Sequence, residues 1–222
     1  ILLIYLKIIK YINLIHTHMH WVYIIRCDNN VIYVGETKRL YRRLNEHCNK
    51  DSGSVTTHDC YPQSLIGLYK VEDECSILND YNWDFEDEKM LALSLENTIA
   101  EMYMQAMGPK WENVYGGKYH VGYRPENNPG KNLTFNRPYC NCKIPAHLKN
   151  YNGKTYWRCA KKNIWDKLED YVLNTLDFSY QKDPCDFYKD YESNVKFTCE
   201  NLIYKYPINI GTCQLLSDSE DD

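Results

Sequence analysis

The sequence predicts an α+β protein: a small domain with a central three-stranded antiparallel sheet flanked by helices, followed by a smaller domain built around cysteines. Three observations favour this class. Residues 21–47 hold two short β-forming runs, a turn between them, and then a helical pattern. Residues 85–107 form a long helical pattern that Gly-Pro ends. Four cysteines between residues 140 and 185 lie among aromatic and basic side chains.

The first hairpin is predicted from residue types. Residues 22–25 and 31–34 are rich in Val, Ile and Tyr, which favour strands. Residues 28–30, Asp-Asn-Asn, tolerate positive φ angles and suit the tight turn between the two strands. Gly35 is expected to end the second strand.

A helix is predicted after the hairpin, with Thr37 as its N-cap. Leu40 and Leu44 form its core-facing side. Arg43 and His47 stand at positions i and i+4, so they share one helix face. The hairpin and this helix together predict a polar cluster on rigid elements.

Further along, residues 64–71 predict a third strand and residues 71–84 an acidic connection to the long helix. Glu96 falls among the apolar positions of that helix, whereas Glu101 is expected to point away from them. A carboxylate beside an apolar stripe is costly unless it is paired or binds a metal. The predicted stripe consists of Ala92, Leu95, Ile99, Tyr103 and Ala106.

Tyr23, Tyr33, Gly35, Arg43 and His47 occur in a register that resembles the GIY-YIG nuclease family. Two departures are mild, since Val stands where the family has Ile in each strand motif. The resemblance covers roughly residues 20–120, about half of the chain.

The resemblance implies the remaining site residues and their roles. Glu96 would hold a divalent cation, Mg²⁺ or Mn²⁺, and Asn113 would lie at the entry to a final strand. Arg43 would neutralise the phosphoryl oxygens. Tyr23, together with His47, would take a proton from water, while Tyr33 would orient the water or the phosphate.

The cysteines predict a structural zinc site. Cys140 and Cys142 form a C-x-C pair, and thiolates bind zinc tetrahedrally. Cys159 and Cys185 are the chosen third and fourth ligands. His147 and Cys199 remain alternatives for the fourth position. The other cysteines are expected to be structural.

The cysteine segment resembles a GRF-type zinc finger, a module that binds nucleic acid, often single-stranded DNA. It departs from that pattern in having Lys154 for Arg, Tyr156 for Phe, a helix-like insert at 163–176, and the closing aromatic displaced to Tyr191. Cations attract phosphates and aromatic rings stack on bases. The predicted nucleic-acid contacts are Lys154, Tyr156, Trp157, Arg158, Lys161 and Lys162.

The formal net charge of −4 hides a strong asymmetry. Residues 108–165 hold eleven Lys and Arg against two Glu, a net charge of +9, whereas residues 71–101 have a net charge of −9. A basic segment between acidic ones is compatible with a nucleic-acid partner.

The expected domain organisation has five parts: an accessory segment 1–18, a nuclease-like domain 19–120, a linker 121–138, the zinc finger 139–192, and a C-terminal segment 193–222 whose acidic end could recruit a protein partner. No membrane span is expected. The scattered cysteines and the lack of a secretory signal indicate a reducing compartment inside the cell, the nucleus or a cytoplasmic viral factory.

The function predicted from these features is metal-dependent endonuclease cleavage of DNA, with the finger binding single-stranded or branched DNA. The sequence leaves two alternatives open: a catalytically inactive nucleic-acid-binding adaptor, and a zinc-dependent interaction protein. It leaves the choice between DNA and RNA open as well.

Overall fold

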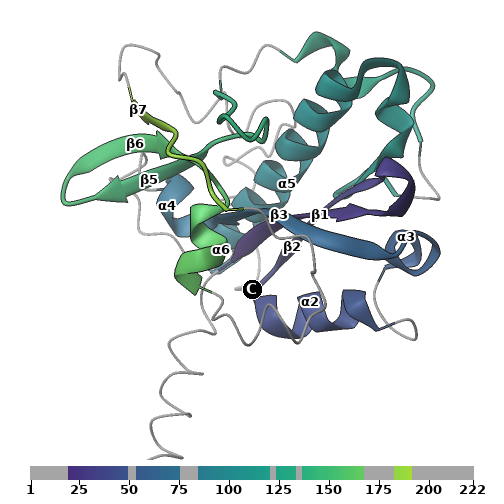
Figure 1. Ribbon diagram of the computed structural model, residues 1–222, viewed down its shortest axis with the longest axis horizontal. Coiled ribbons are helices and arrows are strands. Elements are labelled where there is room, and N and C mark those ends of the chain that lie inside the picture. Colours follow the sequence, from purple (N-terminus) through teal and green to yellow (C-terminus); the bar gives the residue numbers. More distant parts are fainter. Residues whose placement is uncertain are drawn as a thin grey trace, which may run out of the picture. The chain divides into compact units, whose positions relative to one another are not determined.

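The computed structural model describes residues 20–49, 54–75, 85–120, 124–133, 137–167 and 183–191. All of them belong to one compact unit, Ile1–Tyr191 (Figure 1). The accessory segment 1–18 and the acidic tail fall outside the described residues. Among the helices described, none has both the length and the apolar character that a membrane span requires.

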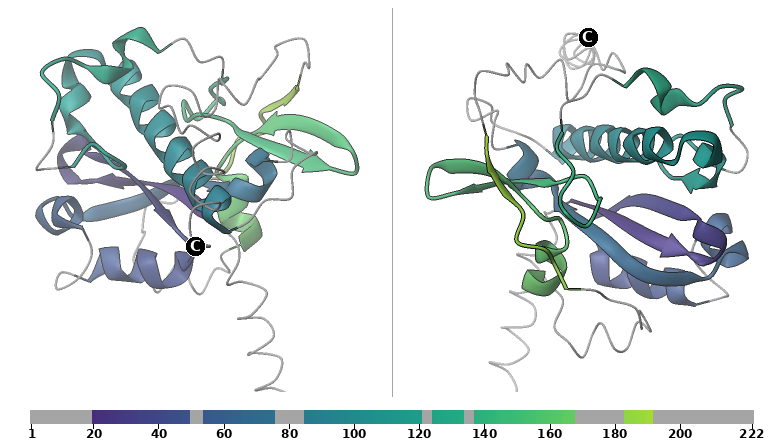
Figure 2. Two further views of the ribbon diagram at one scale, coloured as in Figure 1. Left: turned by 180° about the vertical axis from the view of Figure 1, so that it is seen from behind. Right: turned by 45° about the horizontal axis from the view of Figure 1, so that its top comes forward.

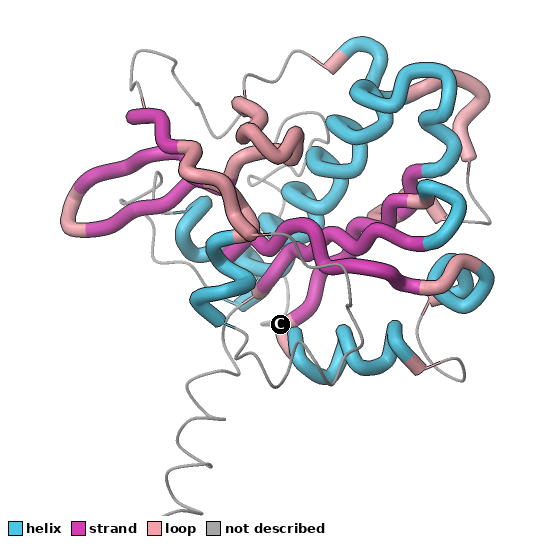
Figure 3. The backbone as a smooth tube through the Cα atoms, in the orientation of Figure 1, coloured by secondary structure: helices cyan, strands magenta, loops and turns pink. Residues whose placement is uncertain are grey.

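The central sheet has four strands in the order β3-β1-β2-β4 (Figure 3). β1 (Trp21–Cys27) pairs antiparallel with both β2 (Ile32–Thr37) and β3 (Pro62–Lys70), which confirms the predicted three-stranded core. The short strand β4 (Val114–Tyr115) adds to β2 in the parallel direction. The sheet is therefore mixed, in an α+β fold.

The residue types predicted the hairpin turn correctly, but the predicted end of the second strand is wrong. The turn is a short 3₁₀ segment, η1 (Asp28–Asn30), in which Asn29 and Asn30 have φ angles of 57° and 59°. Asparagine tolerates this left-handed region better than most residues. β2 does not end at Gly35 but continues to Thr37.

Helices cover both faces of the sheet (Figure 2). α5 (Phe85–Met107) lies along one face and ends, as predicted, at Gly108, whose φ angle is +55°. α2 (Leu40–Cys48) covers the other face, where Leu40 and Leu44 join the core. Arg39, not Thr37, is the N-cap of α2. The Thr37 hydroxyl instead accepts a hydrogen bond from the Arg39 N–H (3.0 Å).

Two short helices were not expected. α3 (Val55–Asp59) begins at a capping box, in which Ser54 and Thr57 satisfy each other's backbone N–H groups. α4 (Val71–Cys75) continues directly from β3, in what was expected to be a plain acidic connection. Both helices matter for the site, because each places polar side chains against neighbouring elements.

The stripe of α5 is buried at Ala92, Leu95, Ile99 and Tyr103, but Ala106 is exposed. The expected orientation of Glu101 is wrong. Glu101 is only 2% exposed, and its carboxylate accepts a hydrogen bond from the Tyr119 hydroxyl (2.5 Å). A tertiary partner therefore makes burial of this second carboxylate tolerable.

A second sheet, β5-β6-β7, carries the cysteine segment. It consists of β5 (His147–Tyr151), β6 (Lys154–Arg158) and β7 (Tyr188–Asp190), all antiparallel. α6 (Lys162–Lys167) follows β6 at the start of the predicted helical insert. The remainder of that insert lies outside the described residues.

The cysteine segment is joined to the first sheet by buried contacts. Arg137 donates two hydrogen bonds to Glu74 of α4 (2.9 and 2.8 Å). The Leu68 N–H of β3 donates to the Ala160 carbonyl (3.3 Å). Ile164 of α6 belongs to the same hydrophobic core as Trp21 and Tyr23. The two sheets thus share one interior.

Candidate functional site

Two tyrosines of the hairpin face α2. Tyr23 on β1 is fully buried, and its ring centroid lies 6.3 Å from that of Tyr33 on β2. Both rings contact the imidazole of His47, at centroid distances of 5.6 and 5.0 Å. The alternation of the strands and the helical spacing of α2 place these three side chains in one cluster.

The imidazole of His47 lies in a chain of hydrogen bonds between Thr57 and Tyr23. When the Thr57 hydroxyl donates to the Ser54 carbonyl (3.1 Å), its oxygen, which also accepts from the Ser54 N–H (3.2 Å), can accept from His47 Nδ1–H (2.8 Å). His47 Nε2 then carries no proton and accepts the hydrogen bond of the Tyr23 hydroxyl (2.7 Å). His47 is thereby positioned to receive the phenolic proton of Tyr23. Sequence reasoning missed Ser54 and Thr57, although their S-x-x-T spacing is a helix-start signal.

Burial keeps the phenols of Tyr23 and Tyr33 protonated and therefore neutral. Burial raises the pKa of Tyr23 well above its usual value, Tyr33 raises it further, and the charge and hydrogen bond of Arg43 oppose both effects. Burial also raises the pKa of Tyr33, again opposed by Arg43. Burial and then the Arg43 charge lower the pKa of His47 to about 3, so the imidazole is neutral near pH 7.

Because the buried His47 imidazole is neutral in the folded protein, we expect the folded state to lose stability as the pH falls. The unfolded chain binds a proton at His47 below pH 6.5, whereas the folded protein does so only near pH 3. The unfolding free energy should therefore fall as pH decreases through this window, by up to about 2 kcal/mol between pH 6.5 and 5 from this group. Urea unfolding at a series of pH values measures it. His47→Gln should flatten the slope in part, because burial also lowers the pKa of His147. An unchanged slope in His47→Gln would contradict the assignment, and the exposed His120→Gln is the matched control.

Arg43 stands beside the two phenols with its guanidinium partly in solvent. Its side chain is 29% exposed, and Nη1 donates to Glu46 (2.9 Å). It is thus close enough to Tyr23 to affect its pKa and open enough to meet a ligand.

Glu96 reaches the same cluster from α5. It is 5% exposed, and one carboxylate oxygen accepts a hydrogen bond from the Gly117 N–H (2.9 Å). Burial raises its pKa to about 7; the Gly117 N–H opposes this, the Glu36 carboxylate adds to it, and Arg43 lowers it. The negative charge of Glu96 raises the pKa of both Tyr23 and Tyr33. A buried oxygen donor of this kind fits a hard divalent cation.

Asn113 lies at the entry to the fourth strand of the sheet. It ends the 3₁₀ segment η3 (Gly108–Asn113), directly before β4, whose Val114 pairs with Ile32 at the start of β2. Tyr33, one of the two phenols, is the next residue of β2 and pairs with Tyr115. Among the described residues, no hydrogen bond links the Asn113 side chain to the other candidates. Its position indicates a role in entering the fourth strand.

Gly35 leaves room for the phenol of Tyr23. A Cβ at this position would lie 2.3 Å from the Tyr23 hydroxyl and 2.9 Å from the Tyr33 ring. Gly35→Ala should therefore displace the Tyr23 hydroxyl from His47 and reduce activity strongly, with a stability loss of about 1–3 kcal/mol from overpacking. Cleavage rate and thermal unfolding, measured together, test this.

The matched control for that substitution is Gly67→Ala, which would crowd Ile24 (3.0 Å) instead of a phenol. It should lower stability without a comparable loss of activity. Equal activity losses in the two variants at equal stability would contradict the role assigned to Gly35.

The geometry around Tyr23, Tyr33, Arg43 and Glu96 agrees with a comparison to known families. Residues 19–103 match the GIY-YIG catalytic domain. This domain defines a family of nucleases that act on DNA. Comparisons with curated proteins and with solved structures gave no match. No GRF-type finger model matches the cysteine segment.

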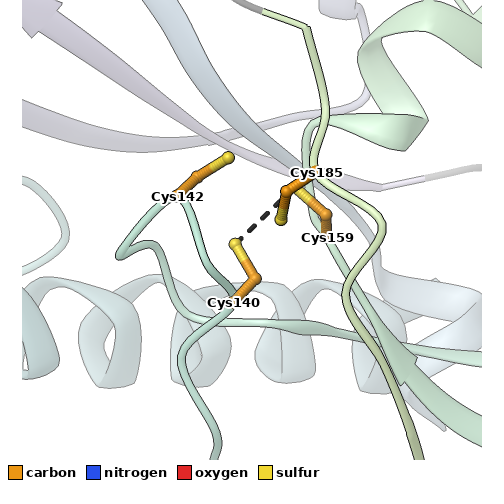
Figure 4. A group of neighbouring side chains, drawn as sticks. All are labelled: Cys140, Cys142, Cys159 and Cys185. Carbon is orange, nitrogen blue, oxygen red and sulfur yellow. Dashed lines mark hydrogen bonds between the residues drawn. The ribbon is translucent and has the colours of Figure 1, made fainter.

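Beyond the GIY-YIG domain, the four predicted zinc ligands converge (Figure 4). The sulfur atoms of Cys140, Cys142, Cys159 and Cys185 all lie within 4.8 Å of one another. Tetrahedral Zn–S bonds of about 2.3 Å place sulfur atoms roughly 3.8 Å apart, so the four thiols suit zinc. The Cys140 thiol lies 3.6 Å from Cys159 and lowers the pKa of that thiol to about 5.

The structure favours Cys185 over the alternative fourth ligands. His147 is fully buried elsewhere, where its Nε2 accepts from the Lys70 N–H (3.4 Å) and lies 3.7 Å from Asp73. Cys199 lies outside the described residues. A tight turn presents the C-x-C pair, since the Lys143 N–H donates to the Cys140 carbonyl (2.8 Å) and Lys143 has a φ angle of 59°.

The predicted nucleic-acid surface is smaller than its sequence suggests. Trp157 is 4% and Lys161 7% exposed, so neither can serve as a surface contact. Arg158 donates to Asp166 (2.9 Å) and Asn163. Lys154 is exposed at the β5–β6 turn, Lys162 is partly exposed, and the Tyr156 ring stacks at 5.0 Å on the exposed Tyr188. The accessible aromatic residues of the second sheet include Tyr156 and Tyr188, with Tyr151 at the turn, while Trp165 of α6 is exposed as well.

Proposed function

We propose that the protein is a metal-dependent endonuclease that hydrolyses DNA phosphodiester bonds. The observation that carries the proposal is the convergence of two phenols, a guanidinium and a buried carboxylate, on Tyr23, Tyr33, Arg43 and Glu96. Each supplies one requirement of phosphodiester hydrolysis: activation of water, neutralisation of phosphoryl charge, and a ligand for a cation.

In the proposed reaction, Tyr23 takes a proton from the attacking water as it gives its own proton to His47 Nε2. The new hydroxide forms a bond to phosphorus, and the bond from phosphorus to the leaving oxygen breaks. Arg43 would neutralise the non-bridging oxygens, and Tyr33 would orient the phosphate or the water. His47 Nε2 is the atom that the Tyr23 hydroxyl already contacts (2.7 Å), and the negative charge of a bound phosphate at Arg43 would offset the Arg43 charge that lowers the pKa of His47.

Glu96 is the proposed ligand for Mg²⁺ or Mn²⁺. When bound there, such a cation would supply positive charge to the phosphoryl and leaving oxygens. Without a cation, burial leaves the Glu96 carboxyl with a pKa of about 7. The backbone N–H groups of Gly117 and Glu36 both donate to the Glu96 carboxylate and hold it in place, and a cation would bind its remaining oxygen lone pairs.

The cysteine segment is proposed to be a zinc-stabilised module that binds DNA, single-stranded or branched. The support is the group of four thiols, together with the accessible rings of Tyr151, Tyr156 and Tyr188 beside Lys154. Aromatic faces stack on unpaired bases more readily than on bases held in a duplex. The free state of all seven described cysteines suits the proposed reducing compartment, nucleus or viral factory. A protein partner for the acidic tail remains a proposal from the sequence.

A cleavage assay tests the proposed function. Single-stranded, duplex, flap and junction DNAs are incubated with the protein and Mg²⁺ or Mn²⁺, with EDTA as control. Cleavage that requires the cation is the expected result. Binding to DNA without cleavage under any cation would favour the alternative, a nucleic-acid-binding adaptor with an inactive nuclease domain.

A further inference from the structure

An open groove of about 530 Å³ adjoins Arg43. It lies where the end of β2, the start of α2 and the first turns of α5 meet. Its cationic lining consists of Lys38, Arg39, Arg42, Arg43 and Lys89, and its acidic lining consists of Glu36 and Glu46.

The acidic side chains of the groove are already paired. Glu46 accepts hydrogen bonds from Arg42 (2.7 Å) and Arg43 (2.9 Å), and the Arg42 bond, followed by the Arg43 bond, lowers the pKa of Glu46. Glu36 lies 3.2 Å from His20 Nδ1. With five cations against two carboxylates, the groove is positive. The Arg42 side chain is 66% exposed, and exposed ion pairs contribute little to stability, so a phosphate can take the place of Glu46.

The groove offers charge but almost no aromatic surface. Its one ring is that of His20, which is 2% exposed and therefore cannot stack on a base. This lining contrasts with the Tyr156–Tyr188 pair on the second sheet. A surface that offers lysine and arginine but no aromatic ring binds phosphate oxygens and distinguishes little between bases.

We infer that this groove binds the sugar–phosphate backbone of the strand being cut, next to the scissile phosphate, without reading its bases. The inference rests on the proposed function, because that function places the scissile phosphate at Arg43. Arg39 at the start of α2 and Lys89 on α5 are lining residues that lie outside the catalytic cluster. They are positioning residues for the substrate.

The test measures DNA affinity against salt concentration. Fluorescence anisotropy with a labelled duplex and EDTA, to prevent cleavage, gives the slope of log Kd against log salt for the whole protein. Arg39→Gln and Lys89→Gln should each reduce that slope by about 0.9 and weaken binding equally for duplexes of unrelated sequence. The control is Lys131→Gln, an exposed cation beside the far part of α5, which should leave the slope unchanged. Circular dichroism melts confirm that each variant is folded.

The possible outcomes distinguish a failure of the groove inference from a failure of the proposed nuclease function. One outcome is that the wild type cleaves DNA while the slopes of Arg39→Gln and Lys89→Gln equal that of Lys131→Gln. This result would reject backbone binding in the groove and would leave the proposed nuclease activity supported. Reduced slopes in a protein that never cleaves would support the groove and reject the nuclease. A loss of affinity confined to one duplex sequence would also overturn the inference, because it would mean that bases are read.

Discussion

Glu96→Gln should reduce DNA cleavage by at least about a thousand-fold while leaving DNA affinity close to that of the wild type. Glutamine keeps the shape of the side chain and can still accept the Gly117 N–H, but it removes the negative charge that would hold the cation. Single-turnover cleavage in Mg²⁺, together with binding in EDTA, measures the two effects separately.

A suitable control is Glu112→Gln, an exposed carboxylate of η3, which should retain full activity. Cleavage persisting in Glu96→Gln at high Mg²⁺ concentration would reject the metal role. Because burial raises the pKa of Glu96, the glutamine variant should be folded at least as well as the wild type above pH 7.

Loss of the proposed zinc from the four-cysteine cluster should unfold the whole described unit, not only the cysteine segment. Structural zinc contributes roughly 10–16 kcal/mol of apparent binding free energy in small zinc modules, which is as large as the total stability of most domains. The contacts of Arg137 with Glu74 and of Asn163 with the Leu68 carbonyl (2.6 Å) connect the cluster to β3 and α4. Ile164 extends that connection into the core around Tyr23.

Cys159→Ser, or chelation of the wild type, should therefore lower the melting temperature and abolish nuclease activity in a single transition. Metal analysis and thermal unfolding followed by circular dichroism check this. Cys48→Ala, a thiol on α2 outside the cluster, should keep its zinc and lose much less stability. An unchanged melt after zinc removal would show that the first sheet folds without the cluster.

Local sequence patterns correctly predicted the parts of the fold that depend on interactions between neighbouring residues in the chain. The hairpin, its Asn29-Asn30 turn and the helix α5 follow from strand propensity, positive-φ tolerance and helical periodicity. The spacing of Arg43 and His47 likewise fixed their common helix face. Their convergence with the hairpin came from family resemblance, because no local pattern specifies which face of a helix meets which strand.

Tertiary contacts account for what the sequence did not predict. Glu101 is buried because Tyr119, eighteen residues away, supplies its hydrogen bond. Trp157 and Lys161 are of the aromatic and basic types that a nucleic-acid-binding surface uses, but both are buried in the fold. The Glu36, Ser54, Thr57 and Gly117 contributions to the site depend on where separate segments meet, which residue types alone do not determine.

The hydrogen bond from Gly117 to Glu96 sets a practical limit on how the molecule can be shortened. Gly117 lies fourteen positions beyond the last residue of the matched segment 19–103, yet its amide fixes the orientation of the carboxylate. A fragment cut at the edge of the recognisable motif would keep every catalytic side chain and still lose the alignment of one of them. The shortest fragment expected to retain the proposed activity is therefore longer than the matched segment 19–103.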